Sequence, residues 1–104
     1  MTAWHWAFDG IADKPQCPVS IALFIDRLVE LTGLTKIADL GVQTAPDGGL
    51  VGGVIIAESH ITCHLKPDGR GFIDVFSCVP FDVPAAYRLV HEALGGWWES
   101  RRLR

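Results

Sequence analysis

The fold is decided by residues 50–78, which read LVGGVIIAESHITCHLKPDGRGFIDVFSC. Residues 50–57 are almost wholly apolar and rich in β-branched side chains, a composition typical of a buried strand. Residues 60–66 and 71–78 have the pattern of two more strands, and Pro67-Asp68-Gly69 between them is typical of a tight turn. This stretch therefore predicts three successive strands, the last two joined as a hairpin.

The chain before this stretch predicts a strand, a helix and a second strand. Residues 3–9 alternate, with two tryptophans and a phenylalanine on one face, as expected for a strand. Residues 10–18 contain one glycine and two prolines and predict a loop. Val19–Thr32 carries its apolar residues on one helical stripe, and Gly33 is a typical helix stop. A further strand is expected over Lys36–Gln43.

The remaining segments predict a turn, a second helix and a short last strand. Residues 45–49 read Ala-Pro-Asp-Gly-Gly, which is typical of a turn. Asp82 can cap a helix that extends to about Leu94, with a proline in the tolerated first turn. Gly95-Gly96 ends that helix, and Trp97-Trp98 with the basic tail is compatible with a short strand.

Together these elements predict the fold class. Strands paired in hairpins, with two helices on one side, imply an α+β two-layer sandwich, a mainly antiparallel sheet with two helices packed on one face. The chain has 104 residues, of which 49% are hydrophobic and 20% are charged, so it can bury a core. We expect a single domain over residues 1–104.

Composition and charge argue against two classes of partner. The formal net charge is −3, and the basic residues that cluster in the sequence are Arg101, Arg102 and Arg104. A nucleic-acid binder carries a broader basic surface, so we expect no nucleic-acid partner. No apolar run reaches the roughly 18–20 residues that cross a bilayer, so we expect no membrane partner.

The cysteines favour a reducing compartment. There are three of them, Cys17, Cys63 and Cys78. An odd number without a secretion signal argues against a disulfide framework, and the N-terminal residues lack the basic start and apolar stretch of a signal peptide. The sequence therefore predicts a cytoplasmic protein with free thiols.

The densest polar cluster interrupts the predicted strands, and it consists of Glu58, Ser59, His60, Cys63, His64, Asp68, Asp74 and Cys78. A metal site is the first interpretation of these residue types. Residues four apart in a strand lie about 13 Å apart, which is too far for His60 and His64 to share one ion. The stretch also lacks a Cys-x2-Cys pair, so we expect no metal.

A nucleophilic hydrolase is the second interpretation. The Gly-x-Ser-x-Gly pattern of a nucleophile elbow is absent around Ser59. Cys78 as a nucleophile with His64 as its base is chemically permitted, but the pairing is a generic one.

Self-cleavage at Ser59 is the third interpretation. The serine hydroxyl can attack the carbonyl of Glu58 and turn the amide into an ester. Loss of the serine α-proton then eliminates the upstream carboxylate, and the resulting dehydroalanine hydrolyses to a pyruvoyl group at a new N-terminus. This route needs a strained peptide at a strand junction, a base and an oxyanion donor. The residues permit it, with His64 near enough in sequence to serve, but do not select it by themselves.

Residues 57–68 and 73–78 resemble the core signature of bacterial and archaeal S-adenosylmethionine decarboxylases. That signature reads Glu-Ser-His, a short apolar spacer, His, a Pro-acid pair, and then Asp-Val-Phe-Thr-Cys. The present chain has Glu58-Ser59-His60, His64, Pro67-Asp68 and Asp74-Val75-Phe76-Ser77-Cys78 in the same order. Several fixed positions in order are far more specific than a single short motif.

The resemblance implies a role for each matching residue. The bond between Glu58 and Ser59 is the self-cleavage bond, and Ser59 becomes the pyruvoyl group. His64 assists processing in the elimination step, and Cys78 is the acid that protonates the α-carbon of the substrate after carbon dioxide leaves. Asp68 occupies the place of a glutamate that contacts the substrate.

The resemblance also implies the reaction and the assembly. The pyruvoyl carbonyl forms a Schiff base with the amine of a small-molecule substrate, so no metal or added cofactor is required. The implied enzyme is a carboxy-lyase that decarboxylates S-adenosylmethionine in spermidine (polyamine) biosynthesis. The small members of the family form homodimers of cleaved protomers.

Two alternatives stay open beside this implied function. Lys66 stands where the family has a tryptophan, and with Asp68 and Arg70 it makes the expected substrate site more charged. That charge favours a pyruvoyl-dependent L-ornithine or L-arginine decarboxylase, with Lys66 and Asp68 as substrate-binding residues. Val51 aligns with a serine that aids processing, which favours an uncleaved, non-catalytic relative acting as a binding or regulatory subunit.

Overall fold

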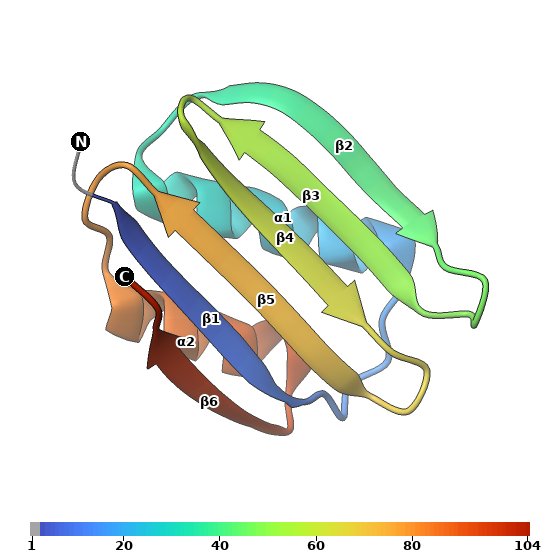
Figure 1. The fold of residues 1–104 in the computed structure, drawn as a ribbon. Coiled ribbons are helices and arrows are strands. Elements are labelled where there is room, and N and C mark those ends of the chain that lie inside the picture. Colours follow the sequence, from blue (N-terminus) through green and yellow to red (C-terminus); the bar gives the residue numbers. More distant parts are fainter. Residues whose placement is uncertain (1–2) are drawn as a thin grey trace.

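The structure is a computed structural model and describes residues 3–104. Its elements follow one another along the chain as shown in Figure 1. They are β1 (Trp4–Ile11), α1 (Pro18–Thr32), β2 (Lys36–Thr44), β3 (Leu50–Ile56), β4 (Ser59–Leu65), β5 (Arg70–Ser77), α2 (Val83–Leu94) and β6 (Trp97–Arg102).

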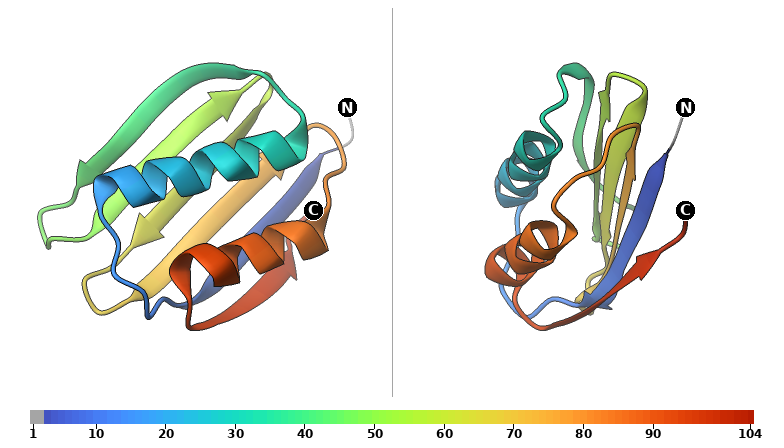
Figure 2. Two further views of the ribbon diagram at one scale, coloured as in Figure 1. Left: turned by 180° about the vertical axis from the view of Figure 1, so that it is seen from behind. Right: turned by 90° about the vertical axis from the view of Figure 1, so that its left-hand side faces the viewer.

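The strands form one six-stranded sheet in the order β2-β3-β4-β5-β1-β6. Every neighbouring pair is antiparallel, and β2 to β5 follow one another as hairpins. Both helices lie on the same side of the sheet, which Figure 2 shows edge-on. The predicted α+β two-layer sandwich is therefore confirmed.

The two faces of the sheet differ because side chains alternate along each strand. In β4 the side chains of Ser59, Ile61 and Cys63 are buried, the last two within the core that contacts the helices, whereas His60 and His64 alternate with them and lie on the opposite side. We call the side beneath the helices the covered face and the other side the open face. The hydrophobic core fills the covered face between the sheet and the apolar stripes of α1 and α2.

Both helices end where the sequence predicts, α2 also begins there, and α1 begins one residue earlier than predicted, at Pro18. Cys17 and Ser20 cap the start of α1, because the side chain of each residue accepts a hydrogen bond from the backbone N–H of the other. Gly33 ends the helix in the left-handed conformation with φ 69°. The carboxylate of Asp82 accepts a hydrogen bond from the backbone N–H of Ala85 and caps α2. Neither helix within residues 3–104 is long and apolar enough to cross a membrane.

The prediction was wrong at Gly10, which continues β1 instead of starting a loop. Gly10 pairs with Gly71 of β5 on one side and with Trp98 of β6 on the other. A Cβ at Gly10 would overlap the backbone of Trp97 and the ring of Trp98. The glycine therefore permits a close approach of β6 and does not break the strand.

The indole of Trp98 also fills the space above Gly71, so we expect a side chain at position 71 to lower the stability of the fold. A Cβ at Gly71 would overlap the six-membered ring of Trp98, a residue that is 2% exposed. We expect Gly71→Ala to destabilise the fold by about 1–3 kcal/mol through overpacking. Chemical denaturation followed by circular dichroism measures this loss.

A double-mutant cycle tests the cause of that loss. Trp98→Phe removes the ring atoms that the new methyl group would meet. The combination of Gly71→Ala with Trp98→Phe is therefore expected to cost less than the sum of the two single changes. Additive costs would show that the indole is not the obstacle.

Candidate active site

The segment between β3 and β4 is a two-residue turn, Ala57-Glu58, and Ser59 is the first residue of β4. Ile56 pairs with Ser59 across the turn. Ala57 has φ 52°, a left-handed conformation that costs a residue with a Cβ about 1–3 kcal/mol. Its backbone N–H donates to the carbonyl of Thr35 at 3.1 Å, which helps to hold the turn in this conformation. Strain is thus stored one residue before the Glu58–Ser59 bond.

Ser59 lies next to the end of β5. His60 pairs with Phe76, so Ser59, the residue before His60, lies beside Ser77, where β5 ends. The Ser59 side chain is 2% exposed, and its Oγ accepts a hydrogen bond from the backbone N–H of Cys78 at 2.8 Å. The fold therefore joins residues 19 positions apart, Ser59 and Cys78, into one small polar site.

His64 does not share this site within one chain. It lies on the open face of β4, exposed, between Val51 of β3 and Phe72 of β5. Five residues along a strand correspond to about 17 Å, and Ser59 points to the opposite face of the sheet. His64 therefore cannot contact Ser59 of its own chain in this fold.

Lys66 and Asp68 lie still farther from Ser59, in the turn that joins β4 to β5. The Lys66 ammonium donates to Asp47 at 3.2 Å. Asp68 accepts from the backbone N–H and from the Nε of Arg70, both at 3.0 Å, and the backbone bond is the main cause of the lowered pKa of Asp68. Both predicted substrate-binding groups are therefore engaged in local ion pairs at the other end of the strand.

A cluster on the open face was not recognised from the sequence as a unit. Asp74 uses both carboxylate oxygens, one toward His5 Nε2 at 2.6 Å and the other toward His60 Nε2 at 3.2 Å. The Phe76 ring lies between the two imidazoles, 5.4 Å from each ring centroid. The alternation in residues 3–9 did place His5 opposite the tryptophans, but the neighbour of β1 became evident only from the strand order.

Metal ligands do not converge in the part of the chain that the structure describes. Residues 3–104 contain no group of three or more His, Cys, Asp or Glu side chains arranged to hold an ion.

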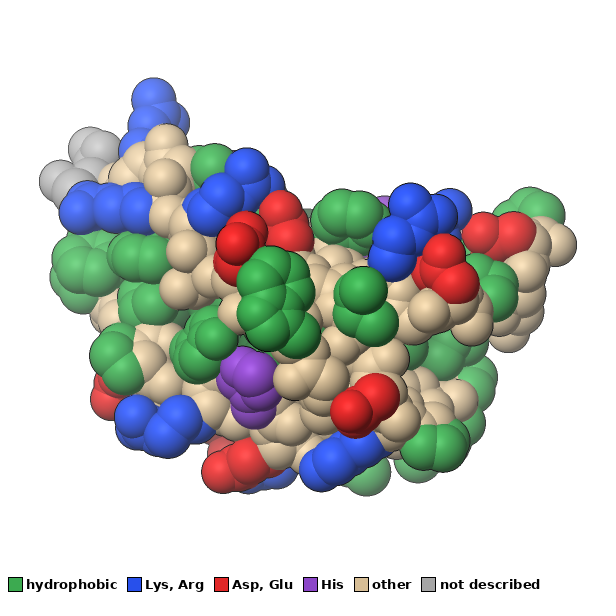
Figure 3. All heavy atoms as spheres, turned by 90° about the horizontal axis from the view of Figure 1, so that it is seen from below, with side chains coloured by type: hydrophobic (Ala, Val, Ile, Leu, Met, Phe, Trp, Pro, Cys, Tyr) green, Lys and Arg blue, Asp and Glu red, His purple; other side chains and the backbone are tan. Residues whose placement is uncertain are grey.

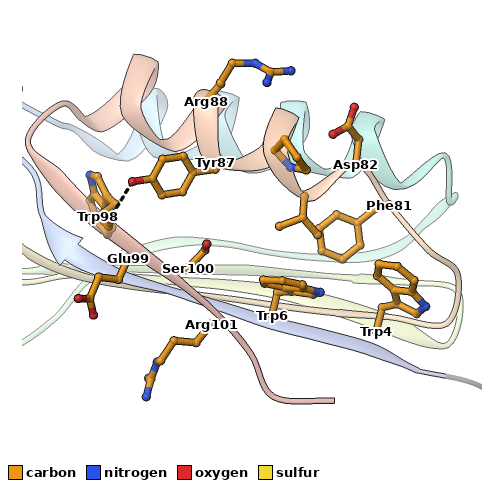
Figure 4. A pocket seen from close by; sticks show the side chains of 12 residues that line it. Trp4, Trp6, Phe81, Asp82, Tyr87, Arg88, Trp98, Glu99, Ser100 and Arg101 are labelled. Carbon is orange, nitrogen blue, oxygen red and sulfur yellow. Dashed lines mark hydrogen bonds between the residues drawn. The ribbon is translucent and has the colours of Figure 1, made fainter.

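Three of the four tryptophans belong to a groove beside α2 rather than to the Ser59 site. Figure 4 shows the side chains of Trp4 and Trp6 from β1 facing Phe81 and Tyr87, with Trp98 at one end. The groove has a volume of about 960 Å³, and the Tyr87 hydroxyl donates to the carbonyl of Trp98 at 2.7 Å. Ser59 and Cys78 do not line this groove.

The charged side chains are mixed rather than separated by sign. Figure 3 shows basic side chains next to acidic ones at several places on the face seen from below. Ion pairs such as Arg101–Asp9 at 2.7 Å likewise bring opposite charges together. That face therefore carries no continuous basic surface.

Cys17 and Cys63 lie in different environments, and this difference predicts how fast each thiol reacts. Hydrogen bonds from Ser20, first its backbone N–H and then its side chain, lower the pKa of the exposed Cys17. Burial raises the pKa of Cys63 to about 12. Because the thiolate is the reactive form, iodoacetamide near pH 8 is expected to label Cys17 well before Cys63. Peptide mass spectrometry measures the rates, and equal labelling of both in folded protein would contradict this expectation.

Comparison with known proteins places the chain in a family. The sequence profile described as S-adenosylmethionine decarboxylase matches residues 9–101, which is most of the chain. The chain belongs to the S-adenosylmethionine decarboxylase family. The match includes β4, the end of β5 and the turn before Ser59, so the predicted family assignment is confirmed.

Curated members of the S-adenosylmethionine decarboxylase family resemble the chain over most of its length. A protein of Aquifex aeolicus (strain VF5) named S-adenosylmethionine decarboxylase proenzyme is 37% identical over 78 residues, which are 74% of this chain and 56% of that protein. A proenzyme of the same name from Anoxybacillus flavithermus is 32% identical over 93 residues, 88% of this chain and 71% of that protein. The chain thus spans 56% of the length of the Aquifex relative.

A solved structure of the S-adenosylmethionine decarboxylase family has the same fold. The crystal structure of the adenosylmethionine decarboxylase from Aquifex aeolicus VF5 superposes with a TM-score of 0.75 at 25% sequence identity. The superposition covers 96% of this chain and 87% of that one, so the likeness extends over nearly the whole chain.

Proposed function

We propose that this chain is the precursor of a self-processing, pyruvoyl-dependent decarboxylase that cuts itself between Glu58 and Ser59. The observation that carries the proposal is the hydrogen bond of 2.8 Å between Ser59 Oγ and the backbone N–H of Cys78, at the start of β4. It joins the two residues to which the family resemblance assigns the cleavage and the proton donation. We propose S-adenosylmethionine as the substrate, in spermidine biosynthesis, and the cytoplasm as the location.

The turn before Ser59 supplies conditions that self-cleavage needs. Attack of the Ser59 hydroxyl on the Glu58 carbonyl breaks the amide bond and forms an ester. The left-handed Ala57 raises the energy of the peptide that reacts, and breaking the turn releases that strain. The Cys78 N–H already binds Ser59 Oγ and so fixes the hydroxyl at the junction.

The residues around Ser59 fit a pyruvoyl group made from it. The group is small, and it would lie at the end of a strand that is paired on both sides, next to the chain segment that carries Cys78. When present, a pyruvoyl group accepts the amine of a substrate and draws electrons from the bond to its carboxylate. Cys78 would return a proton to the substrate carbon, in keeping with its position within one hydrogen bond of Ser59.

Intact mass tests this proposal directly. Cleavage divides the 104 residues into a piece of 58 and a piece of 104 − 58 = 46, the second beginning with the pyruvoyl group. We expect both pieces after expression or after incubation of the purified chain. A single uncleaved chain after long incubation would favour the alternative of a non-catalytic relative. Val51, which pairs with His64, supports that alternative because it stands where the family has a serine that aids processing.

We propose that the active form is a homodimer, because one chain does not complete the site. Ser59 and His64 lie at opposite ends of β4, about 17 Å apart. The open face also leaves Val51, Ile55 and Phe72 at least 36% exposed, a surface suited to association. In a two-fold arrangement of open faces, the end of β4 that carries His64 would approach the Ala57-Glu58 turn of a second copy, where the bond to Ser59 is cleaved.

Complementation between variants tests the dimer. Neither Ser59→Ala nor His64→Ala is expected to cleave by itself, because each lacks one of the two required groups. When the two chains are co-expressed, mixed dimers would bring an intact Ser59 to an intact His64, and cleavage of the His64→Ala chain should return. Absence of cleaved product in mixed dimers, detected by mass, would argue against His64 acting between copies.

The second candidate is a pyruvoyl-dependent decarboxylase of ornithine or arginine. The charged turn of Lys66, Asp68 and Arg70 favours it, since these exposed groups suit a charged substrate better than a flat ring. Release of carbon dioxide from S-adenosylmethionine, ornithine, arginine and lysine separates the candidates. Turnover of a basic amino acid without turnover of S-adenosylmethionine would select the second.

A further inference from the structure

The start of β4 is held by a side-chain cluster that neither cleavage nor proton donation uses. His5, Phe76 and His60 lie in one row across β1, β5 and β4, because Phe76 pairs with both histidines. Asp74 lies two residues along β5 and bridges the two imidazoles through its separate oxygens, at 2.6 and 3.2 Å. We call His5, His60, Asp74 and Phe76 the open-face cluster.

The contacts of the open-face cluster are specific enough to hold the ring of His60 in one position. That ring stacks on Phe76 with an interplanar angle of 10°, while His5 meets the same phenylalanine edge-on at 73°. A carboxylate only accepts hydrogen bonds, so each imidazole donates its Nε2–H to Asp74. The side chains of His5, Asp74 and His60 are 25%, 33% and 41% exposed, so water competes only in part for these bonds.

Cleavage would remove three restraints on this end of the strand and leave its pairing with β3 and β5. The chain reacts with one water molecule and gives the Glu58 carboxylate, a pyruvoyl group on His60 and free ammonia. The oxygen that was Ser59 Oγ leaves with the Glu58 carboxylate, and the Ser59 nitrogen leaves as ammonia. The hydrogen bond from the Cys78 N–H to Ser59 Oγ, the Ser59 N–H and the covalent link through the turn are therefore all lost.

We propose that the open-face cluster is a positioning device that keeps the new end of β4 beside Cys78 after cleavage. The inference rests on the proposed self-processing. His60 becomes the first residue with an intact backbone amide, and its side chain is tied to β5 through Asp74 and Phe76. Asp74 is tied in turn to β1 through His5, so a third strand braces the carboxylate. His5, His60 and Asp74 are thus positioning residues that act on the reaction through the strand end.

Hydrogen exchange tests the proposal in cleaved and uncleaved protein. His60→Ala is introduced into the wild-type chain and into the uncleavable Ser59→Ala chain. In the cleaved protein we expect the amides of residues 61–65 to exchange at least about tenfold faster in His60→Ala than in the wild-type chain. Loss of one hydrogen bond to a charged group corresponds to a change of about this size. In the uncleaved chain the turn still tethers the strand, so the change should be clearly smaller.

Further variants separate the two contacts of His60. Gln at position 60 keeps a donor for Asp74, and Phe keeps the stack on Phe76, so His60→Gln and His60→Phe should each restore part of the protection. Thr62→Ala is the matched control, because Thr62 lies on the same face of β4, directly opposite Asp74, and takes no part in the hydrogen bonds or ring contacts of the cluster. Decarboxylation by the cleaved variants should show a lowered kcat that follows the loss of protection, with little change in Thr62→Ala.

The outcomes distinguish this inference from the proposed function. If the wild-type chain cleaves but His60→Ala alters exchange equally in cleaved and uncleaved protein, or in neither, the positioning role is wrong and self-processing stands. A wild-type chain that never cleaves overturns both.

Discussion

Replacing Ser59 by alanine is expected to abolish self-cleavage and leave one chain of 104 residues. The hydroxyl is the nucleophile of the proposed step and the source of the pyruvoyl group, so no other atom at this position can replace it. Its loss also frees the Cys78 N–H, whose hydrogen bond at 2.8 Å ends on that oxygen. Intact mass after long incubation measures the effect, and decarboxylation should be absent in the same sample.

A matched control distinguishes loss of the Ser59 hydroxyl from a general effect on folding. Ser77 is also buried, 0% exposed, and lies on the covered face next to Ser59 at the end of β5. Its hydroxyl donates to the carbonyl of Val79 at 2.6 Å and has no part in the proposed cleavage. Ser77→Ala should therefore still cleave, although its stability will fall. Cleavage of the Ser59→Ala chain between residues 58 and 59 would rule out the proposed mechanism.

Cys78→Ser is expected to separate processing from decarboxylation. The backbone N–H that binds Ser59 is unchanged by this substitution, so self-cleavage should continue. The thiol is the proposed proton donor, and a hydroxyl is a much weaker acid. Loss of a general acid lowers a rate by about 10²–10⁴-fold, so we expect kcat for carbon dioxide release to fall by that order.

The control for Cys78→Ser is a second cysteine change far from Ser59. Cys17 is exposed at the start of α1, where its thiol caps the helix. It does not belong to the ends of β4 and β5 that carry Ser59 and Cys78. Cys17→Ser replaces the capping sulfur with a capping oxygen and should keep both cleavage and turnover. Full decarboxylation by cleaved Cys78→Ser protein would show that the proton comes from another group.

The sequence predicted the elements of the fold well because their signals are local. The apolar stripe of α1, the cap at Asp82 and the left-handed Gly33 each depend on residues within a few positions of one another. Gly10 was misjudged because a glycine in isolation indicates a break. Its real role depends on Trp98, which reaches it only when β6 pairs with β1.

The candidate site was predicted residue by residue, but its geometry was not. Ser59 and Cys78 came from a resemblance over a short ordered motif, and the structure brings them together. His64, Lys66 and Asp68 belong to the same motif, yet they lie along β4 and beyond it, away from Ser59. Spacing along a chain does not reveal which residues meet when an extended strand separates its own ends by about 3.3 Å per residue.

The amino-acid sequence by itself determined the class of fold, the strand faces and the family, because periodicity, caps and an ordered motif are properties of neighbouring residues. Only the tertiary structure decided which strands are neighbours. The order β2-β3-β4-β5-β1-β6 places the first strand of the chain against β5, and so brings His5 to Asp74, 69 positions away. The same sheet carries Ser59 to Cys78 and keeps it from His64, since pairing joins residues across strands while a rigid strand holds its own residues apart.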